Sequence, residues 1–493
     1  MNNQHSNISQ SLSISFSELA SALGVVFENK SALSTPDVKF SGLSINTRTI
    51  KKGDVFVALK GENFDAHNFI KQAEEQGACG LIVERKVASE LPQLIVTDTR
   101  TALGKIALLW RQKFTLSVIA ITGSCGKTTV KEMTSSILRC AFSGDDSVLA
   151  TLGNLNNDIG VPLTLMRLNT AHKAAVIEIG ANHQGEISQL VKLVQPDVAL
   201  ITNAAHAHIE GFGSIEGVAQ AKSEIYSGLA LRDNTQGIAI INADDKFAEQ
   251  WIKCNQQAEL EGRVKFVTFG LNNTADVSAH YQQKEDGIEL KIKTSLGEQS
   301  VSLNLFGQHN IYNALAATAA SIAIGCSLAD VKNGLESFSD VSGRFERKTG
   351  LHGSLIFDDT YNANPGSVKA GIDALKQIAG QQNTENKMVL ILGDMGELGD
   401  ESKQLHYQLG SDIADLGIEQ LLTVGDYTRE THQAYCAQVS GLNKGDMKAV
   451  HFDNKQELID SIKEQFHDNE LILVKGSRSM AMESVVSAME MAH

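Results

Sequence analysis

The stretch Val118-Ile-Ala-Ile-Thr-Gly-Ser-Cys-Gly-Lys-Thr-Thr129 decides the fold, because an apolar β-branched run leads directly into a glycine-rich turn and a helical pattern. Gly123 and Gly126 allow backbone N–H groups to approach phosphate oxygens, and the following helix offers its positive N-terminus. Lys127 is suited to neutralise β- and γ-phosphates, and Thr128 to hold Mg²⁺. The expected nucleotide contacts of this loop are Gly123, Ser124, Cys125, Gly126, Lys127, Thr128 and Thr129.

This loop departs from the usual phosphate-binding pattern in one respect. The pattern GxxxxGK[ST] places its first glycine at position 121, where this chain has Ile121, so the loop is a shortened variant. A glycine turn that only caps an ordinary helix is the alternative interpretation. The combination of strand, glycines, lysine and paired threonines favours phosphate binding.

Apolar strand patterns recur after the loop, with helical patterns between them, at residues 174–179, 197–202 and 236–242. This alternation predicts a mostly parallel sheet covered on both faces. Further strand patterns occur before the loop, at residues 54–59 and 80–83, and after it, at residues 354–357, 388–392, 420–424, 448–452 and 471–474. Helical patterns are expected at residues 102–111, 311–324 and 455–466.

The chain length fits three domains, because 493 residues exceed the size of a single hydrophobic core, which stops growing near about 250 to 300 residues. We therefore predict an α/β protein with a small α/β N-terminal domain over residues 1–103. A central P-loop ATPase domain with a parallel sheet follows over residues 104–338. Residues 339–493 form a C-terminal Rossmann-like domain, although no GxGxxG fingerprint is present.

The composition argues against several classes of protein. The net charge of −15 opposes general binding to nucleic acid, which needs clustered Lys and Arg. The six cysteines are scattered without CxxC spacing, so neither a zinc site nor a disulfide framework is indicated. No signal peptide or membrane-spanning run is recognisable. We expect a cytoplasmic protein without membrane insertion or a nucleic-acid partner.

Three polar residues that follow later strands, Glu178, His206 and His208, are candidates for a metal site. Glu178 ends an apolar strand pattern at the edge where open parallel sheets bind ligands, although a solvated strand end is an equal alternative on position alone. His206 and His208 lie just past the next strand, and Lys222 lies in a helical pattern. Taken singly, each histidine is more often a surface or core residue, and Lys222 a solvated lysine.

Eight motifs in order extend the pattern over nearly the whole chain: Thr122-Gly-Ser-Cys-Gly-Lys-Thr-Thr129, Glu178-Ile-Gly-Ala-Asn182, His208-Ile-Glu-Gly-Phe-Gly-Ser214, Ala221-Lys-Ser-Glu-Ile-Tyr226, Gly307-Gln-His-Asn310, Ser342-Gly-Arg-Phe-Glu346, Asp358-Asp-Thr-Tyr-Asn-Ala-Asn-Pro365 and Leu392-Gly-Asp-Met-Gly-Glu-Leu398. In these motifs the chain resembles the Mur ligases, the ATP-dependent amide-forming enzymes of peptidoglycan precursor synthesis. It is most similar to the members that add D-alanyl-D-alanine to a UDP-MurNAc-tripeptide.

The resemblance implies ATP and two Mg²⁺ ions as cofactors. Thr128 and Glu178 would hold the first ion, and Glu178, His208 and a carbamylated Lys222 the second. Carbamylation makes chemical sense, because adding CO₂ to a neutral lysine creates an oxygen-bearing anion of the kind that Mg²⁺ prefers. The implied catalytic residues are Lys127, Glu178, His208, Lys222 and Arg344.

The resemblance also implies ligand contacts outside the loop. Nucleotide contacts would come from Asn310, Arg344, Asp359, Tyr361 and Asn362, although Asn310 could instead cap a helix and Arg344 form a surface ion pair. Contacts to the UDP-linked substrate would come from Ser44, Thr47, Arg48 and Asn182. Asn46 stands where the family usually has Asp, which leaves its contact open.

The implied reaction passes through an acyl phosphate, which the amine of D-alanyl-D-alanine then attacks. The base for the amine proton is unassigned, with His206 as one candidate. Domain closure about a hinge near residues 339–343 is expected, as is a monomer. A MurE-like or folylpolyglutamate synthase-like ligase is the alternative within the class, and a P-loop NTPase switch or motor or a catalytically silent scaffold is the alternative outside it.

Overall fold

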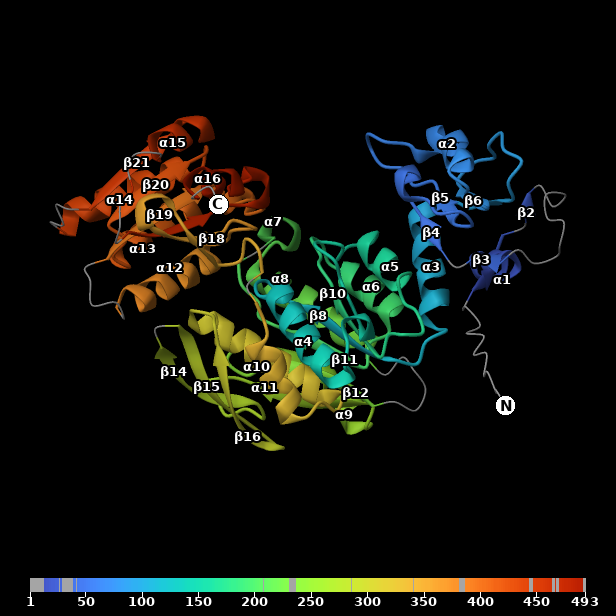
Figure 1. Cartoon of the computed structure of the whole chain (residues 1–493), viewed down its shortest axis with the longest axis horizontal. Helices are drawn as coiled ribbons and strands as arrows, with labels where there is room; N and C mark the ends of the chain where they lie inside the picture. The colour runs from blue at the N-terminus through green and yellow to red at the C-terminus, as the bar shows by residue number, and fades with distance from the viewer. Residues whose placement is uncertain are drawn as a thin grey trace, which may run out of the picture.

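The computed structural model describes residues 13–25, 27–28, 39–40, 42–206, 208–229, 236–284, 286–339, 341–380, 386–442, 447–462, 466 and 470–490. Figure 1 shows an N-terminal unit in blue, a central unit in teal, green and yellow, and a C-terminal unit in orange and red. The first and last units lie on opposite sides above the central unit. This mixed α/β architecture confirms the predicted fold class.

The N-terminal unit is built on a five-stranded sheet with the order β2-β7-β6-β5-β4. Only β2 runs antiparallel to its neighbour. Helix α1 (Phe16–Leu23) begins with a capping box, in which Ser15 and Glu18 satisfy each other's backbone N–H groups. The other elements are β1 (Ile14–Ser15), β2 (Phe27–Glu28), β3 (Lys39–Phe40), β4 (Leu43–Ser44), β5 (Val55–Val57), α2 (Ile70–Glu75), β6 (Gly80–Val83) and β7 (Gln93–Ile95).

Helix α3 (Thr99–Arg111) joins the N-terminal and central units. Asp98 caps the helix by accepting a hydrogen bond from Thr101 N, so it begins three residues before the predicted start. Its apolar face, with Leu103, Ile106 and Trp110, lies in a core that runs from α1 into the central unit. The domain boundary at residue 103 therefore falls inside a helix that packs on both units, and it stays a prediction.

The central unit contains a six-stranded sheet, all parallel, with the order β13-β12-β11-β8-β10-β9. Strand β8 (Ser117–Thr122) lies in the middle, and the strands that follow it lie on both sides, so its carboxyl end opens at a topological switch point. The predicted strands are confirmed as β8, β10, β11 and β12, whereas β9 and β13 were not predicted. The remaining strands are β9 (Val148–Ala150), β10 (Ala174–Glu178), β11 (Val198–Ile201), β12 (Gly237–Asn242) and β13 (Val264–Phe269).

Both faces of the central sheet are covered by helices. Successive residues of β8 point to opposite faces of the sheet, so Ala120 and Ile121 lie in two different apolar cores. The helices on the Ala120 side include α5 (Gly160–Leu165), α6 (Glu186–Val194), α8 (Ile215–Ser223) and α9 (Ala248–Leu260). Those on the Ile121 side are α4 (Lys127–Phe142), α10 (Gln308–Ala323) and α11 (Leu328–Glu336).

A three-stranded antiparallel sheet, β14 (Ser278–Lys284), β15 (Gly287–Thr294) and β16 (Gly297–Leu303), was not predicted. Its turns use Gly287 and Gly297, both with positive φ. Only one face is buried, with Ile288 and Leu290 packed in the same core as α10 and α11. The sheet therefore lacks the continuous apolar runs of a doubly covered parallel strand.

The C-terminal unit has a six-stranded sheet with the order β17-β18-β22-β19-β20-β21, in which only β17 is antiparallel. The five strands predicted here are confirmed. They are β18 (Leu355–Asp359), β19 (Lys387–Gly393), β20 (Gln420–Val424), β21 (Lys448–Phe452) and β22 (Glu470–Lys475), beside the unpredicted β17 (Glu346–Thr349).

Helices cover both faces of this C-terminal sheet too. One face carries α12 (Pro365–Ala379), α13 (Ser402–Asp415) and α14 (Thr428–Leu442), and the other α15 (Lys455–Ile462) and α16 (Glu483–Met489). The helix predicted at residues 455–466 is described as far as Ile462, and residues 463–465 lie outside the described part. Two layers of helices around a mainly parallel sheet match the Rossmann-like prediction.

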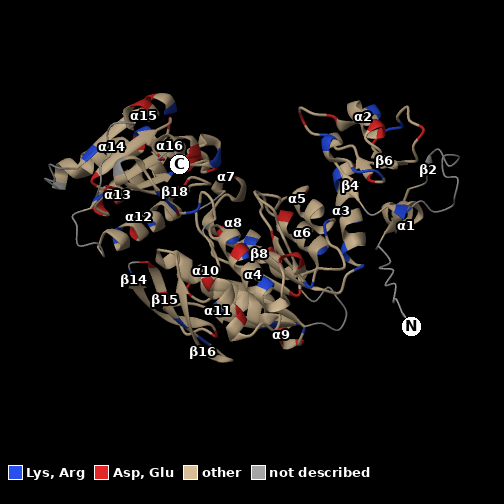
Figure 2. Cartoon of the chain, in the orientation of Figure 1, with Lys and Arg blue, Asp and Glu red and all other residues tan. Residues whose placement is uncertain are grey.

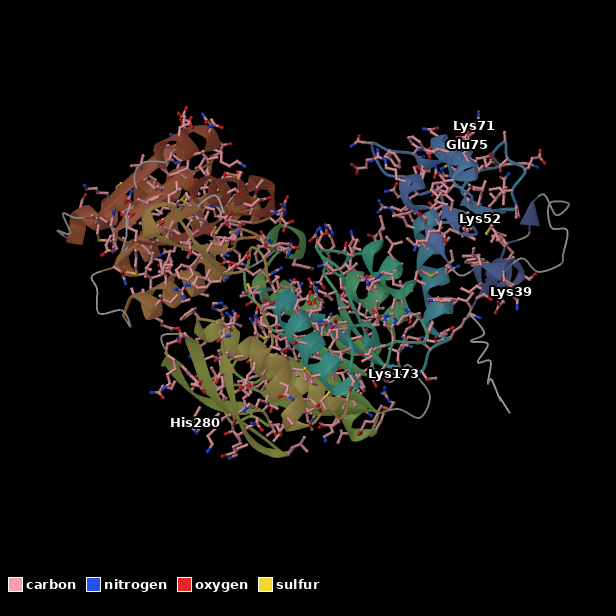
Figure 3. All side chains as sticks on the ribbon, in the orientation of Figure 1. Lys39, Lys52, Lys71, Glu75, Lys173 and His280 are labelled. Carbon is pink, nitrogen blue, oxygen red and sulfur yellow. The ribbon has the colours of Figure 1, made fainter. Side chains whose placement is uncertain are left out.

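Charged side chains of both signs are mixed over all three units (Figure 2). Side chains such as Lys71 and Glu75 of α2 and His280 of β14 lie on outer surfaces, away from the space between the units (Figure 3). Within the part of the chain that the structure describes, no helix combines the length and apolar character needed to cross a membrane.

Candidate active site

The phosphate loop connects the buried strand β8 to α4. Both loop glycines adopt positive φ and are approached closely by other residues. A Cβ atom on Gly123 would lie 1.9 Å from Thr202 Oγ1, and one on Gly126 would lie 2.4 Å from Asn313 Oδ1. The loop can therefore form only with glycine at these two positions.

Lys127 begins α4 and folds back over the loop. Its Nζ atom donates hydrogen bonds to the carbonyl oxygens of Gly123, at 2.6 Å, and Ser124, at 3.3 Å. Burial lowers the pKa of this ammonium, while the nearby Glu178 carboxylate acts in the opposite direction. An anionic ligand in the loop would add further negative charge beside this partly buried ammonium.

Thr128 lies at the centre of a polar chain that crosses the unit boundary. Its Oγ1 donates to Glu178 Oε2 at 2.9 Å and accepts from an Arg344 terminal nitrogen at 2.8 Å. Asn156 Nδ2 donates to Glu178 Oε1 at 2.9 Å, and Glu178 is only 2% exposed. Glu178 is therefore a buried carboxylate that accepts hydrogen bonds from Thr128 and Asn156, rather than a solvated strand end.

These groups line a cavity of about 990 Å³ between the central and C-terminal units. Most of the predicted site residues line it: Ser124, Cys125, Gly126, Lys127, Thr128, Thr129, Glu178, Asn182, His208, Lys222, Asn310, Arg344, Asp359, Tyr361 and Asn362. Gly123 does not line the cavity, but its carbonyl oxygen accepts a hydrogen bond from Lys127. Ser44, Thr47 and Arg48 belong to the N-terminal unit and do not line this cavity. The structure thus brings residues from two separate sheets to one space.

Arg344 reaches the phosphate loop from the C-terminal unit. Its guanidinium stacks on the Tyr361 ring at 4.1 Å while a terminal nitrogen contacts Thr128. Among the described residues its buried Nε atom has no hydrogen-bond partner. Arg344 is therefore not a surface ion pair, and it places a guanidinium, a good partner for phosphate oxygens, at the wall of the cavity.

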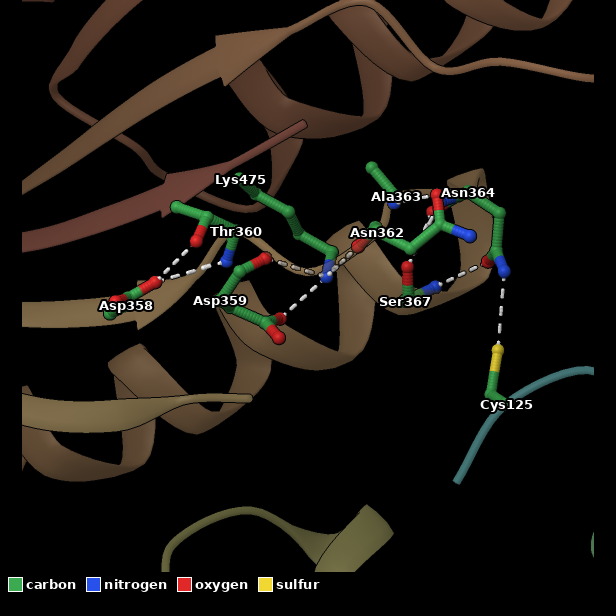
Figure 4. A network of polar contacts seen from close by, with 9 residues as sticks. All are labelled: Cys125, Asp358, Asp359, Thr360, Asn362, Ala363, Asn364, Ser367 and Lys475. Carbon is green, nitrogen blue, oxygen red and sulfur yellow. Dashed lines mark hydrogen bonds and ion pairs between the residues drawn. The ribbon is translucent and has the colours of Figure 1, made fainter. Parts of the chain in front are cut away.

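Asp359, at the end of β18, is held by a lysine that the sequence analysis missed. Lys475 ends the neighbouring strand β22, is 2% exposed, and donates to Asp359 Oδ2 at 2.6 Å and to Asn362 O at 2.9 Å (Figure 4). One buried ammonium thus fixes both the carboxylate and the loop after β18. The sequence offers one signal for this site residue, because Lys475 directly follows the apolar run at residues 471–474.

The same loop also touches the phosphate loop directly. Asn364 caps α12 by accepting from Ser367 N, and its Nδ2 atom donates to Cys125 Sγ at 3.2 Å (Figure 4). Cys125 therefore serves as a contact point between the units. Together with the Arg344 contact, this hydrogen bond joins the C-terminal unit to the phosphate loop at Cys125 and Thr128.

We expect Lys475→Ala to destabilise the C-terminal unit by about 3 kcal/mol, because it leaves Asp359 without its buried partner. The thermal transition of that unit, followed by calorimetry, should move to lower temperature, and ADP should bind more weakly. Lys403→Ala, which changes an exposed lysine of α13, is the matched control. An unchanged transition in Lys475→Ala would contradict the role given to this pair.

Asn310 lies near the start of α10 but does not cap it, because the cap position is Gly307. Its Nδ2 atom donates to Phe306 O at 2.9 Å, and its Oδ1 atom accepts from Asn313 at 3.1 Å. Asn313 also lies against Gly126 of the phosphate loop. The amide pair therefore connects the start of α10 to the loop.

Lys222 is buried, at 1% exposure, in α8. Its Nζ atom lies 5.4 Å from the centre of the Phe212 ring. Burial, with a smaller contribution from Lys127, lowers the pKa of the Lys222 amine to about 7. Lys222 is therefore not a solvated helix lysine, and its burial favours the neutral form of the amine.

His208 precedes the short helix α7 (Ile209–Phe212) and faces the C-terminal unit. Its Nδ1 atom lies 2.5 Å from Glu397 Oε2, close enough for an ion pair but without hydrogen-bond alignment. The His208 imidazole holds the pKa of Glu397 below its usual range. Glu397 was not predicted as a site residue, and His206 is exposed and does not line the cavity.

The donor set fits a divalent cation beside a nucleotide. Thr128 and Glu178 offer hard oxygen atoms next to the phosphate loop, and Mg²⁺ commonly takes few protein ligands besides phosphate oxygens. No three His, Cys, Asp or Glu side chains of the described residues converge as a complete cage. A second ion would use His208 and Glu178 together with an oxygen ligand that Lys222 gains only after carbamylation.

The predicted substrate residues of the N-terminal unit lie in or just before the short 3₁₀ turn Thr47–Thr49. Asn46 caps this turn, since its Oδ1 accepts from Arg48 N at 3.0 Å. An amide oxygen performs this task as an Asp carboxylate would. Ser44 Oγ donates to Asn46 O, Thr47 Oγ1 donates to Gln72, and the Arg48 side chain is exposed.

Three family models match consecutive parts of the chain. The model described as "Mur ligase family, catalytic domain" matches residues 39–111, "Mur ligase middle domain" matches residues 121–321, and "Mur ligase, glutamate ligase domain" matches residues 343–478. Together they cover most of the chain and all three units.

Curated relatives and solved structures agree with these matches. The UDP-N-acetylmuramoyl-tripeptide–D-alanyl-D-alanine ligase of Escherichia coli is 44% identical over 92% of this chain and 94% of its own length. MurF from Acinetobacter baumannii has a TM-score of 0.83 at 37% identity, covering 97% of this chain and 98% of its own. MurF ligase from Thermotoga maritima in complex with ADP has a TM-score of 0.74 at 26% identity, covering 91% and 96%. The chain belongs to the Mur ligase family.

Proposed function

We propose that this protein is an ATP-dependent ligase that adds D-alanyl-D-alanine to UDP-N-acetylmuramoyl-tripeptide and so forms the pentapeptide precursor of peptidoglycan. The observation that carries the proposal is the hydrogen-bonded chain Arg344–Thr128–Glu178, which joins the phosphate loop to the third unit. A simple NTPase switch has no need for a second sheet that completes its phosphate site. The relatives named above supply the identity of the substrates.

In this reaction the peptide carboxylate attacks the γ-phosphate of ATP, which gives ADP and an acyl phosphate. The amine of D-alanyl-D-alanine then attacks the acyl carbon, and phosphate leaves. Each like-charge pair at about 4 Å costs about 4 kcal/mol at an effective dielectric of about 20. Lys127 and Arg344 supply fixed positive charge around these oxygens, and the loop N–H groups hold the phosphates in place.

The nucleotide would extend from the phosphate loop toward the third unit. Asn310 is placed to contact it from α10, and Asp359, fixed by Lys475, to bind its ribose. Tyr361 and Asn362 lie on the adjoining loop. When bound, Mg²⁺ neutralises phosphate charge and polarises the acyl oxygen, with Thr128, Glu178, His208 and carbamylated Lys222 as its protein ligands.

The N-terminal unit would bind the UDP part of the substrate. Ser44 and Thr47 fix the turn that presents the Arg48 guanidinium, a suitable partner for diphosphate. Asn182, which lines the cavity, would contact the peptide part. We further propose that residues 1–103, 104–338 and 339–493 act as three domains of a cytoplasmic monomer.

One assay separates this proposal from the alternatives. Phosphate release should require UDP-MurNAc-tripeptide and D-alanyl-D-alanine together. Activity with a free L-amino acid or with glutamate in place of the dipeptide would indicate a MurE-like or folylpolyglutamate synthase-like enzyme. Phosphate release that is indifferent to any carboxylate or amine would indicate an NTPase switch.

Closure of the third domain is the second expectation of this proposal. The hinge would lie near residues 339–343, of which residue 340 lies outside the described part of the chain. We expect small-angle scattering to show a smaller radius of gyration with a non-hydrolysable ATP analogue and UDP-MurNAc-tripeptide together, because the ligands would favour the conformation seen here, in which Arg344 contacts the phosphate loop. An unchanged radius of gyration would refute closure as described.

A further inference from the structure

A turn of the third unit, residues 395–399, docks on α7 of the central unit beside His208. The backbone N–H of Glu210 donates to the carbonyl oxygen of Glu397 at 3.5 Å. A Cβ atom on Gly399 would lie 3.3 Å from the Glu210 Cα atom, so the two backbones approach closely. The docked turn places the Glu397 side chain over His208.

His208 and Glu397 share an unusual backbone conformation. Their φ angles are +56° and +62°, and both are non-glycine residues in the left-handed region. Such a conformation is unfavourable for a residue with a side chain and is found where the surrounding structure holds it in place. Here two such residues face each other across a unit boundary, with Nδ1 and Oε2 2.5 Å apart.

The chemistry of the pair indicates what this arrangement can do. A histidine that binds a metal ion through one ring nitrogen usually presents the other nitrogen to a carboxylate or a carbonyl oxygen. That second contact fixes the tautomer and the orientation of the ring. In this structure Glu397 occupies the Nδ1 side of His208, which leaves Nε2 as the ligand atom.

We propose that Glu397 is a positioning residue, which orients His208 for a divalent cation only while the third unit is docked on α7. The inference rests on the proposed function, because that function assigns His208 to the metal. Glu397 comes from the moving unit, whereas His208, Glu178 and Lys222 belong to the central unit. Docking would therefore complete the metal site as well as the nucleotide site.

The test uses Mn²⁺ as the probe, in the full chain with ADP and without the peptide substrates. Electron spin-echo modulation should detect a ¹⁴N nucleus coupled to Mn²⁺ in the wild type, and His208→Ala identifies this signal by removing it. We expect Glu397→Ala to weaken the signal and to raise the Kd for Mn²⁺ by about 10- to 100-fold. Glu397→Gln, which keeps an acceptor oxygen, should restore most of both. Glu401→Gln, an exposed change four residues away, is the control.

Two results would overturn the inference. One is an unchanged ¹⁴N coupling and Mn²⁺ affinity in Glu397→Ala. The other is normal Mn²⁺ binding with a raised KM for D-alanyl-D-alanine, which would assign Glu397 to the amine substrate instead. A failure of the proposed function would show itself in a different measurement. The wild type would then not join UDP-MurNAc-tripeptide to D-alanyl-D-alanine, whereas the Mn²⁺ signal could still be measured.

Discussion

Lys127→Met should lower kcat by about 1,000-fold, the upper range for the loss of one preorganised charged group in a reaction site. The lysine is the partly buried cation of the phosphate loop, and its ammonium donates to the carbonyl oxygens of Gly123 and Ser124. When nucleotide is bound, the same ammonium is close enough to neutralise phosphate charge that grows as the acyl phosphate forms. The loss should therefore fall on kcat more than on the KM for the dipeptide.

The control for this change is Lys192→Met, which alters an exposed lysine of α6 in the same unit. It should leave kcat within a factor of about 2, since exposed substitutions away from a site have small effects. Phosphate release by Lys127→Met at more than a tenth of the wild-type rate would show that charge at this position is dispensable. Circular dichroism and a thermal scan would establish that the variant is folded.

Much of the scaffold was readable from the sequence because buried parallel strands are continuous apolar runs. Strand β8 and the strands of the C-terminal sheet have this character, and their predicted positions agree with the structure to within a few residues. The antiparallel sheet β14-β15-β16 was missed because only one face is buried, so its signal is alternation rather than an apolar run. The glycines of its two turns, Gly287 and Gly297, are the local signal in the sequence that marks this sheet.

The phosphate loop was also readable, because its chemistry lies within a few consecutive residues. Other parts of the site arise only when distant segments meet. Asn156 reaches Glu178, Lys475 reaches Asp359, and Glu397 reaches His208 through contacts between separate strands or units. Spacing along the chain carries no sign of these pairs, apart from the lysine that closes an apolar strand.

Lys222 shows how burial changes the chemistry of a residue with an ordinary sequence context. In the sequence it has the default interpretation of a solvated lysine in a helix, and only the resemblance singles it out. The fold places it at 1% exposure and near another cation, Lys127, which together lower the pKa of its amine to about 7. CO₂ reacts with the neutral amine, so this environment favours the proposed carbamate.

We expect Lys222→Ala to lower kcat by about 1,000-fold, because an anionic metal ligand is lost. Millimolar acetate or formate should restore part of the activity by occupying the vacated space, and neither should change the rate of Lys192→Met. If no short carboxylate restores any activity, the carbamate hypothesis fails. Wild-type activity should also fall as the pH drops through about 7, since protonation removes the amine that reacts with CO₂.

Stability gives an independent test of the same buried amine. An unfolded lysine has a pKa of about 10.4, so between pH of about 7 and about 10 the unfolded chain binds more protons than the folded chain. The stability of the wild type without CO₂ therefore rises with pH across this window, and the full cost of burying the amine, on the order of 4 kcal/mol, is present below it. Lys222→Met removes that cost. Its thermal transition should lie above that of the wild type at pH 6, and the difference should shrink toward pH 9. A difference that is independent of pH would show that the amine is protonated in the folded protein throughout, which would leave no neutral lysine for CO₂ to modify.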